Sequence, residues 1–459
     1  MHTIFQLLSK RYTRENTSSS PLGPDVSHVA SKHIVVAGAG IAGLSFALSL
    51  HKLWPASFSS QLPRITIIER DSKADRLGRE GYTLSIRVDG NRGGGVQVLD
   101  DLGLYEVVRD VAVIVDSGIG VDTDCINLSD GKQKAGNMVL WDKNWRPLLK
   151  VDPEKMQNES KRKLSGMRIR RNALQEVLAN ATAALPDVTM MWERRVVNVK
   201  NGATGAGDSM VVVLDDGSNI SCDIIIAADG SKSKIRTALR PSDGLNYSGV
   251  VAISGNARFE SRDQIPKPLA NDWGALLGWT GVGIFVAPVD PTAALWSLSY
   301  RAGQPRDIPR KPFSNATISS LLEEARGLGI HAGPKFRTLV DNTDPSTLMV
   351  FNAFDRPPFR HDFEKHGNVI WIGDANHAVT PFAGNGANMA MMDSWDLVKE
   401  LVKGEHGGFE KSVRAWERSM MPRTEAVLKE SHRNMDVGHA VGWKAWFYWS
   451  ILKVLALFT

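Results

Sequence analysis

Cysteine is scarce in this chain, which has two cysteines, Cys125 and Cys222, among 459 residues. Two cysteines are too few for a disulfide framework, and they lack the spacing of zinc ligands, so the sequence predicts a reducing, cytoplasmic setting and no metal site. An excess of one charge is also missing, because 55 basic and 50 acidic residues leave a net charge of only +5. A mild, thinly spread excess suits anionic small molecules at most, and no nucleic-acid partner is expected.

A long hydrophobic run is missing as well. At residues 442–459, two lysines interrupt an apolar stretch that is shorter than the ~20 residues of a spanning helix. Tryptophans beside lysines are typical of an interfacial amphipathic helix. The same composition suits a helix that packs across two domains or against a dimer partner. The sequence therefore predicts either peripheral membrane contact or a packing role, such as dimerisation, for this tail.

A glycine-rich motif follows the first buried strand. The apolar run 34–37 stops at Gly38, Gly40 and Gly43, spaced G-x-G-x-x-G, and an apolar helical pattern begins at once. This is the strand, tight turn and helix start of a dinucleotide-binding βαβ unit. Gly38 turns the chain, Gly40 lets the backbone approach a pyrophosphate, and Gly43 lets helix and strand pack closely. The phosphates are then expected on the free N–H groups of the helix.

A second buried strand, residues 64–68, ends at Glu69. A carboxylate at this place accepts hydrogen bonds from the ribose hydroxyls of an adenosine half. Glu69 lies 26 residues after Gly43, somewhat beyond the usual interval of ~20. A longer helix-to-strand loop, residues 55–63, accounts for the difference.

Two later apolar strands also end in an aspartate. Residues 224–228 lead to Asp229, and residues 369–372 lead through a glycine to Asp374, where a carboxylate can accept hydrogen bonds from sugar-alcohol hydroxyls. A loop of small residues then feeds a helix N-terminus, whose N–H groups can face an electron-rich ring edge such as that of a flavin. A basic cluster, residues 168–171, precedes another helix, where it fits either an anionic group or a solvated patch.

In this order, G-A-G-I-A-G with the strand ending at Glu69, A-A-D-G-S-K-S, and G-D-A-N-H-A-V-T-P-F-A-G-N-G-A-N resemble the aromatic-ring-hydroxylase family of FAD-dependent monooxygenases. The third segment resembles the tetracycline-inactivating monooxygenases and their fungal biosynthetic relatives in particular. The resemblance covers residues 33–405. It implies an α/β fold, with a Rossmann-like FAD-binding domain, an inserted β-sheet-rich substrate domain of the p-hydroxybenzoate-hydroxylase kind, and a C-terminal helix.

The resemblance also implies a role for individual residues. Asp374 holds the ribityl chain of FAD, Asp229 contacts FAD and NADPH, and Arg171, with Leu174, forms the R-x-x-L element near the cofactor. His377 supports the loop that follows and is given no proton-transfer role. The full cofactor-binding set is Gly38, Gly40, Gly43, Glu69, Gly81, Arg171, Asp229, Asp374, Pro381, Gly384, Gly386, Ala387 and Asn388.

By the same resemblance, NADPH or NADH reduces the flavin, and O₂ then forms a C4a-hydroperoxide that oxygenates an electron-rich substrate. The cofactor supplies the difficult chemistry, so no catalytic side chain is assigned. Residues 247–301 lack a convincing counterpart of the polar set that grips tetracyclines. The expected substrate is therefore a bulky aromatic or polycyclic compound of secondary metabolism, which is hydroxylated or epoxidised. The alternatives are a flavin-dependent reductase or dehydrogenase of the same fold and a non-catalytic FAD-binding regulatory protein.

The predicted domain organisation is discontinuous. A disordered extension or targeting segment comes first, because its basic, serine-rich composition differs from the rest. Three segments build the FAD domain, two build the substrate domain, and a helical extension with the apolar tail closes the chain. The predicted boundaries are 1–31 for the extension, 32–110, 161–245 and 346–405 for the FAD domain, 111–160 and 246–345 for the substrate domain, and 406–459 for the tail.

Overall fold

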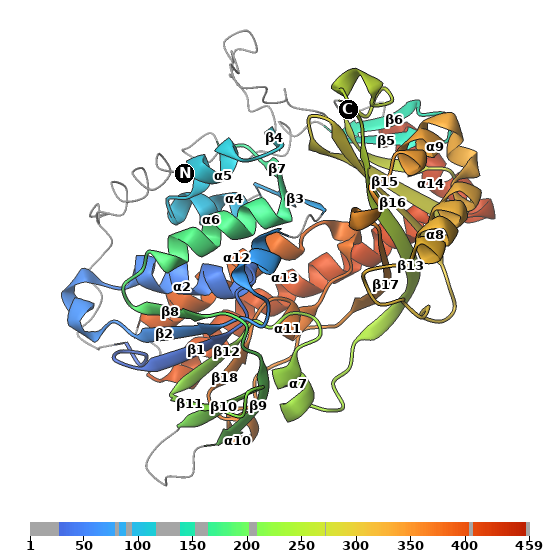
Figure 1. The fold of residues 1–459 in the computed structure, drawn as a ribbon. Helices are drawn as coiled ribbons and strands as arrows, with labels where there is room; N and C mark the ends of the chain where they lie inside the picture. Colours follow the sequence, from blue (N-terminus) through green and yellow to red (C-terminus); the bar gives the residue numbers. More distant parts are fainter. Residues whose placement is uncertain are drawn as a thin grey trace.

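The computed structural model describes residues 27–78, 82–88, 94–115, 138–151, 164–201, 209–270, 272–403 and 407–455. The two largest sheets, each with its helices, form the two halves of the molecule, and a long helix runs from one half to the other (Figure 1). The prediction of a mixed α/β fold with a parallel sheet is confirmed. No helix within these ranges is both long and apolar enough to span a membrane.

The first sheet has five parallel strands in the order β18-β12-β1-β2-β8. Its apolar runs are continuous because both faces are covered, as is usual for parallel sheets. Within the sheet, Ala37 pairs with Ala227, which pairs with Trp371. The strands are β1 (His33–Ala37), β2 (Arg64–Ile68), β8 (Val188–Met191), β12 (Ile224–Ala227) and β18 (Val369–Trp371).

Helices cover one face of this sheet and a smaller sheet covers the other. Strand residues such as Ile34 and Ile226 pack under the helices, whereas their neighbours Val35 and Ile225 face the small sheet. This alternation follows from the two-residue period of a strand. The helices of the first face are α2 (Ile41–Leu53), α6 (Arg171–Ala183) and α12 (Gly386–Val402). The small sheet has the strands β9 (Val196–Asn201), β10 (Met210–Leu214) and β11 (Asn219–Cys222).

The apolar run 220–228 divides at Asp223 into two strands. β11 is antiparallel to β10, and β12 joins the parallel sheet. The Asp223 carboxylate accepts a hydrogen bond from the backbone N–H of His33 at 2.8 Å. The chain therefore changes sheets where a polar side chain ties it to β1.

The second sheet has seven strands in the order β17-β13-β16-β15-β14-β5-β6. Residues 138–151 supply β5 and β6 far from the other strands in sequence. The strands are β5 (Met138–Asp142), β6 (Pro147–Val151), β13 (Asn246–Arg258), β14 (Trp273–Leu277), β15 (Val282–Asp290), β16 (Ala293–Arg301) and β17 (Met349–Asp355). β17 pairs with β13, although residues 346–355 fall in a predicted FAD-domain segment.

Two helices cover the outer face of the seven-stranded sheet (Figure 1). The first of them is α8 (Asn315–Leu328). A second helix, α9 (Gly333–Asp341), was not predicted. Its Pro334 signals a turn, yet proline is also favoured in the first turn of a helix, where its missing N–H costs nothing. Large buried side chains such as Trp296 and Phe336 fill the space beneath the helices.

A further three-stranded sheet lies beside the first helices and has the order β3-β7-β4, from Thr83–Ile86, Met167–Arg170 and Ile114–Val115. The remaining short helices are α3 (Lys73–Gly78), α4 (Gly95–Asp101), α5 (Tyr105–Asp110), α7 (Lys234–Leu239), α10 (Phe363–His366) and α11 (Asp374–His377). The 3₁₀ turns span Ala56–Gln61, Arg262–Gln264, Ile330–Ala332, Pro345–Thr347 and Pro381–Ala383.

The chain closes with two helices, α13 (Phe409–Gly438) and α14 (Gly442–Leu455). α13 packs beside α12 and reaches β14 and β15 of the seven-stranded sheet. It is therefore the long element that joins the two halves of the molecule in Figure 1. α14 lies against β6 at the far side of that sheet.

Candidate flavin site

The carboxyl ends of β1, β12 and β18 lie side by side, because the three strands are neighbours in one parallel sheet. Gly38 directly follows β1, Asp229 lies two residues after β12, and Asp374 lies three residues after β18. Ligands of open α/β sheets bind at this edge. Three segments that are far apart in sequence thus meet at one place, as the strand-end motifs predict.

The glycine-rich turn leaves no room for side chains. Gly38 has φ +106°, and a Cβ there would lie 2.5 Å from the carbonyl oxygen of Ala228. A Cβ on Gly43 would lie 2.1 Å from the carbonyl oxygen of Gly38. Gly40 is the N-cap of α2 and supplies no side-chain cap. The helix therefore starts tightly against the strand end and presents free N–H groups, as anion binding requires.

Glu69 has a structural task in this turn. Its side chain is buried, and its Oε2 accepts a hydrogen bond from the N–H of Ala39 at 2.9 Å. Its Oε1 accepts a second bond from the N–H of Asp71 at 3.1 Å. Hydrogen bonds to a carboxylate are among the stronger ones in proteins. Glu69 therefore holds the glycine-rich turn in place, and its predicted contact with a ribose stays a prediction.

Asp229 is half engaged. Its Oδ2 accepts hydrogen bonds from the N–H groups of Lys234 at 2.7 Å and Ile235 at 3.4 Å, at the start of α7. Its Oδ1 is buried and has no hydrogen-bond partner among the residues that the structure describes. Burial raises the pKa of the Asp229 carboxyl group. A buried acceptor without a partner at a strand end fits a ligand that donates a hydroxyl.

Asp374 is the accessible carboxylate of the group. Its side chain is exposed, yet the surrounding protein desolvates it and raises its pKa, against the opposing charges of His377, Arg171 and Arg236. A carboxylate that is exposed but poorly hydrated is typical of a concave site. Arg236 also links two of the motifs, because its Nη1 donates to the carbonyl oxygen of Ala375 at 2.7 Å.

The loop after Asp374 ends in the N-terminus of α12. A 3₁₀ turn begins at Pro381, and Gly384 follows with φ +61°. The N–H of Met389 donates to the carbonyl oxygen of Asn385 at 3.0 Å. The N–H groups before it, at the positive end of a 17-residue helix, are those that a helix start leaves free. They belong to Gly386, Ala387 and Asn388.

The Asn388 side chain is engaged within the protein. Its Oδ1 accepts hydrogen bonds from the N–H groups of Arg87 at 2.9 Å and Gly95 at 3.2 Å, and its Nδ2 donates to the carbonyl oxygen of Ser85 at 2.9 Å. Its backbone N–H is among the donors at the start of α12. Asn388 therefore ties β3 and α4 to the start of α12.

Two arginines of the basic cluster have different surroundings. Arg171 is half-buried at the start of α6, and its charge acts on Asp374. Arg168 is buried on β7, where its Nη1 donates to the hydroxyl of Ser85 at 2.8 Å. The basic cluster is thus no solvated patch at Arg168. The predicted flavin neighbour Gly81 lies outside the residues that the structure describes.

His377 supports the loop, as expected. Its Nε2 lies 2.6 Å from Oδ2 of Asp393 on α12, and both side chains are buried. Arg423 on α13 donates to the other oxygen of Asp393 at 2.9 Å, and the N–H of Gly373 donates to Oδ2 at 3.1 Å. These charges hold the pKa of Asp393 below its usual value despite its burial. The network fixes the corner that places Asp374.

The inner face of the seven-stranded sheet is turned towards this loop. Cross-strand pairs share a face, and the pairs Ala275–Phe285, Phe285–Ser297 and Gly283–Ser299 define it. Ser299 lies 3.0 Å from the Nε2 of His439, whose ring contacts Phe382 at 5.8 Å. The members of the inner face are Val250, Ala252, Ser254, Trp273, Ala275, Leu277, Gly283, Phe285, Ala287, Leu295, Ser297 and Ser299.

The middle of the inner face is uncharged, and some of its residues are open. Ala275, Phe285 and Ser297 are half-buried, although they lie in the centre of a sheet. At its edge, Arg168 stacks over the Trp273 ring, with Cζ 4.6 Å from the ring centroid. The Trp273 indole N–H is buried and has no hydrogen-bond partner among the described residues. Sequence reasoning missed this pair, because only strand register brings Arg168 and Trp273 together.

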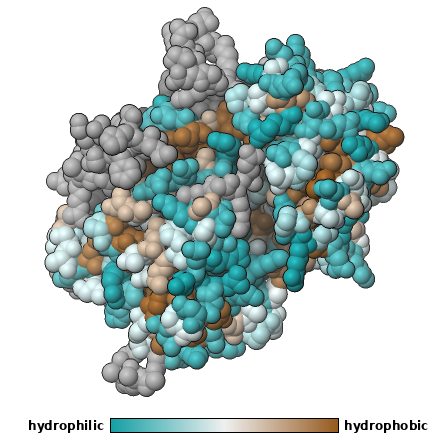
Figure 2. All heavy atoms as spheres, viewed as in Figure 1, coloured by the Kyte–Doolittle hydropathy of each residue, from teal (hydrophilic) through white to brown (hydrophobic). Residues whose placement is uncertain are grey.

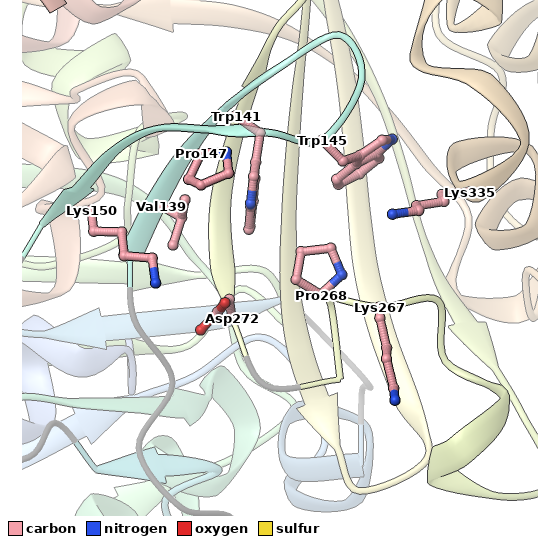
Figure 3. A pocket seen from close by; sticks show the side chains of 9 residues that line it. All are labelled: Val139, Trp141, Trp145, Pro147, Lys150, Lys267, Pro268, Asp272 and Lys335. Carbon is pink, nitrogen blue, oxygen red and sulfur yellow. The ribbon is translucent and has the colours of Figure 1, made fainter. Parts of the chain in front are cut away.

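A separate hollow of about 310 Å³ lies on the other side of this sheet (Figure 3). Trp141, Trp145 and Pro268 line it, and Lys335 extends towards them from α9. Trp141 and Trp145 belong to the core beneath α8 and α9, so this hollow faces away from Phe285. It is therefore distinct from the space over the inner face.

The glycine-rich turn, the two aspartates and the free start of α12 together define a site for a dinucleotide at the carboxyl edge of a parallel sheet. A family model described as FAD binding domain matches residues 31–431. The monooxygenase cfoF of Aspergillus candidus is 34% identical over 418 residues, which are 89% of this chain and 91% of that protein. The chain belongs to this FAD-binding family.

Solved structures share the fold. Klebsiella pneumoniae HpxO, in complex with FAD and uric acid, aligns over 92% of this chain and 93% of its own, with a TM-score of 0.66 and 19% identity. The tetracycline destructase Tet(55) aligns over 93% of this chain and 96% of its own, with a TM-score of 0.62 and 16% identity. The predicted resemblance to flavoprotein monooxygenases is confirmed, as are FAD as the cofactor and the FAD-dependent monooxygenase class of oxidoreductase.

Proposed function

We propose that this protein uses NAD(P)H and O₂ to hydroxylate or epoxidise a bulky aromatic or polycyclic small molecule. One observation carries the proposal: the flavin-type site at the strand ends is joined, through His439 and Phe382, to a sheet face whose middle carries no charged side chain. A face of this kind favours a large substrate with little charge.

The residues at hand fit FAD. We propose that the glycine-rich turn holds the pyrophosphate and that Glu69 lies near the adenosine ribose. Asp229 and Asp374 offer acceptors to ribityl hydroxyls, and Arg171 balances the charge of Asp374. The N–H groups at the start of α12 face the ring edge where negative charge gathers on reduction. When bound, the flavin supplies reduction by NAD(P)H and oxygen activation, for which family resemblance implies a C4a-hydroperoxide.

The protein itself places the substrate and excludes water. We propose that the substrate lies over Ala275, Phe285 and Ser297, and that the indole N–H of Trp273 donates a hydrogen bond to a substrate oxygen. Arg168 acts through Trp273 by stacking on its ring, so it is a positioning residue. No side chain is assigned a catalytic role, because the flavin supplies the oxygen-transfer chemistry.

The biological setting follows from the relatives. We propose secondary metabolism, supported by the identity to the fungal monooxygenase cfoF. We also propose the discontinuous two-domain organisation, with the third FAD-domain segment starting after Asp355, because β17 pairs with β13 of the substrate sheet. The closing helix α14 is proposed as a contact surface, either for a membrane or for a second copy of the chain.

The proposal is tested by purifying the protein, recording its absorption spectrum, and following NAD(P)H and O₂ consumption with a panel of aromatic and polycyclic compounds. Yellow protein whose NAD(P)H oxidation and oxygen uptake are both triggered by one compound, with a product heavier by one oxygen, supports it. Substrate-dependent turnover without oxygen in the product indicates a reductase or dehydrogenase. Yellow protein that never turns over indicates a regulatory FAD-binding protein.

A further inference from the structure

The last helix has an exposed stripe of large apolar side chains. Trp443 is 74% exposed, Trp446 69%, Phe447 49%, Ile451 40% and Val454 55%. Their spacing of three and four residues puts them on one face of α14. Five such side chains in a row are unusual for the solvent face of a protein, where large apolar patches mark interaction sites. We call these five residues the α14 stripe. On the face of the molecule drawn in Figure 2, brown hydrophobic patches interrupt a largely hydrophilic surface.

The opposite face of α14 is attached to the protein. Ala445 is buried, Tyr448, Trp449 and Leu452 are half-buried, and the helix contacts β6. The helix axis is therefore held along the surface of the seven-stranded sheet. A surface helix that is packed on one side normally has a polar outer side. In α14 the outer side is apolar too, so a second apolar partner is needed to cover it.

The charge of the helix is one-sided. Residues 442–455 contain two lysines and no acidic residue. Lys444 is exposed beside the stripe, with its ammonium nitrogen 5.9 Å from the centroid of the Trp443 ring. Tryptophan and lysine side by side are suited to the boundary between anionic headgroups and acyl chains. The exposed Lys150 on β6 adds another positive charge close to the helix.

The length and composition of α14 select one occupant. Its 14 described residues extend for roughly 21 Å, against about 30 Å of hydrocarbon in a bilayer. Because the helix also packs along β6, this favours an orientation in the membrane plane. A symmetric contact between two copies would join two helices of the same positive charge, neither of which has a carboxylate to offset it. An anionic lipid surface has the opposite charge and accepts the aromatic rings.

We propose that the α14 stripe docks this enzyme onto an anionic lipid surface, with the helix axis parallel to the membrane. The stripe inserts between headgroups, and Lys444 meets lipid phosphates or carboxylates. The proposal does not depend on which compound the enzyme oxygenates, and its failure would leave the proposed oxygenation untouched. It also gives a lipophilic substrate a short path, since such compounds partition into bilayers.

The experiment is co-sedimentation of the FAD-loaded full chain with vesicles of phosphatidylcholine alone and of phosphatidylcholine with phosphatidylserine. Wild type is expected to bind the mixed vesicles, more weakly in high salt because exposed charges are screened. The triple variant Trp443→Ser, Trp446→Ser, Phe447→Ser should bind roughly tenfold or more weakly, since each lost ring removes apolar contact. Its FAD content should not change, because the three side chains are exposed and distant from the strand ends.

Ile330→Ser is the matched control. Ile330 is 80% exposed in the 3₁₀ turn between α8 and α9. This variant therefore removes an exposed apolar side chain outside the stripe and should bind vesicles like wild type. Light scattering without vesicles measures the oligomeric state and so tests whether the α14 stripe binds a second copy of the chain. A wild-type dimer that becomes monomeric in the triple variant would overturn the proposal, as would a wild-type protein that binds neither kind of vesicle.

Discussion

The three carboxylates at the strand ends do different work, although their positions in the sequence look equivalent. Both carboxylate oxygens of Glu69 accept hydrogen bonds from backbone N–H groups. One oxygen of Asp229 accepts a hydrogen bond from the start of α7, and the other has no hydrogen-bond partner among the described residues. Asp374 is the one whose side chain is exposed. Replacing Asp374 therefore removes the proposed ligand contact without removing a hydrogen bond of the described structure, which makes it the cleanest single-residue test.

Asp374→Ala should lower the FAD content of the purified protein and weaken FAD affinity by about tenfold, the scale of one hydrogen bond to a charged group. Flavin titration followed by fluorescence measures it. Asp263→Ala, at an exposed carboxylate in the turn before β14, is the control and should keep full occupancy. Full FAD retention in Asp374→Ala would refute the assigned role.

Trp273→Phe should raise KM for the substrate several-fold, while FAD content stays at the wild-type level. Phenylalanine keeps an aromatic face for Arg168 but removes the unpartnered indole N–H, so only the proposed hydrogen bond is lost. Steady-state kinetics with the best substrate of the panel measure the change. Trp443→Phe, on the exposed α14 stripe, is the matched control. An unchanged KM in Trp273→Phe would place the substrate elsewhere.

At this scale the sequence identifies side chains at strand ends, because a motif states both the element and its end. It does not predict that Arg168 stacks on Trp273, since their meeting depends on the register of β14 and on β7 lying beside it. Asn388 shows a finer limit. Its position in the loop is readable, but the sequence does not say that its amide is consumed by Arg87, Gly95 and Ser85.

Among the elements, α13 joins the loop between Asp374 and α12 to the seven-stranded sheet. The Nδ2 of Asn434 donates to the carbonyl oxygen of Phe382 at 3.0 Å, and the Ser431 hydroxyl donates to the carbonyl oxygen of Thr380 at 3.1 Å. One turn further on, His439 reaches Ser299 on β16. A single helix therefore fixes the spacing between this loop and the inner face.

The contact between β1 and α2 gives an element-scale prediction. Gly43→Ala should destabilise the protein by at least about 1 kcal/mol and reduce FAD content, because a Cβ would lie 2.1 Å from the carbonyl oxygen of Gly38 and push α2 off the strand end. Thermal unfolding and flavin absorbance measure both effects.

Gly327→Ala is the matched control for this change. Gly327 lies within α8, and no atom of the described residues comes within 4 Å of the position that a Cβ would take there. The same substitution should therefore raise stability by about 0.5–1 kcal/mol. If Gly43→Ala kept wild-type stability and FAD content, close packing at this turn would not be needed for the site.

Helices and strands with a clear apolar pattern can be predicted from the sequence. Elements whose bounds depend on pairing with distant strands cannot. The parallel strands and α12 follow from apolar runs bounded by glycine. The division of 220–228 into β11 and β12 depends on pairing with β10 on one side and β1 on the other. The placement of β17 likewise depends on β13, and α9 hides behind a proline that suits a turn as well as a helix start.

At the scale of the whole molecule, a buried histidine joins α13 to the parallel sheet. The Nε2 of His361 accepts a hydrogen bond from the N–H of Trp371 at 2.9 Å, so its Nδ1 carries the proton and donates to Oε1 of Glu417 at 2.8 Å. Both ring nitrogens are occupied only in the neutral form. Burial accordingly lowers the pKa of His361.

This histidine makes stability depend on pH. The folded state keeps His361 neutral, whereas the unfolded chain takes up its proton near pH 6.5, so the His361 contribution is present above that pH and is lost as the pH falls below it. Glu417, whose pKa is lowered by the His361 and Arg414 hydrogen bonds despite burial, adds a loss of the same sign at lower pH. Each differing proton changes the unfolding free energy by about 1.4 kcal/mol per pH unit.

Urea unfolding at pH 7.5, 6.5 and 5.5 measures this slope. His361→Gln, whose amide oxygen can still accept from Trp371, should be less stable at pH 7.5 but lose less stability towards pH 5.5 than wild type. Asp229 and Asp374 act in the opposite sense, because their raised pKa values favour the folded state as they protonate. They are common to both proteins, so equal slopes would exclude His361 as the source.

The order of strands in the parallel sheet has a consequence for how the enzyme is made. β1 comes from residues 33–37, whereas β18, which is separated from β1 by β12, and the loop after β18 come from residues 369–388. During synthesis, the glycine-rich turn after β1 is made early, but the proposed flavin site is complete only when most of the polypeptide has left the ribosome. Flavin uptake is therefore a late event in the life of each molecule, and truncated chains should emerge colourless.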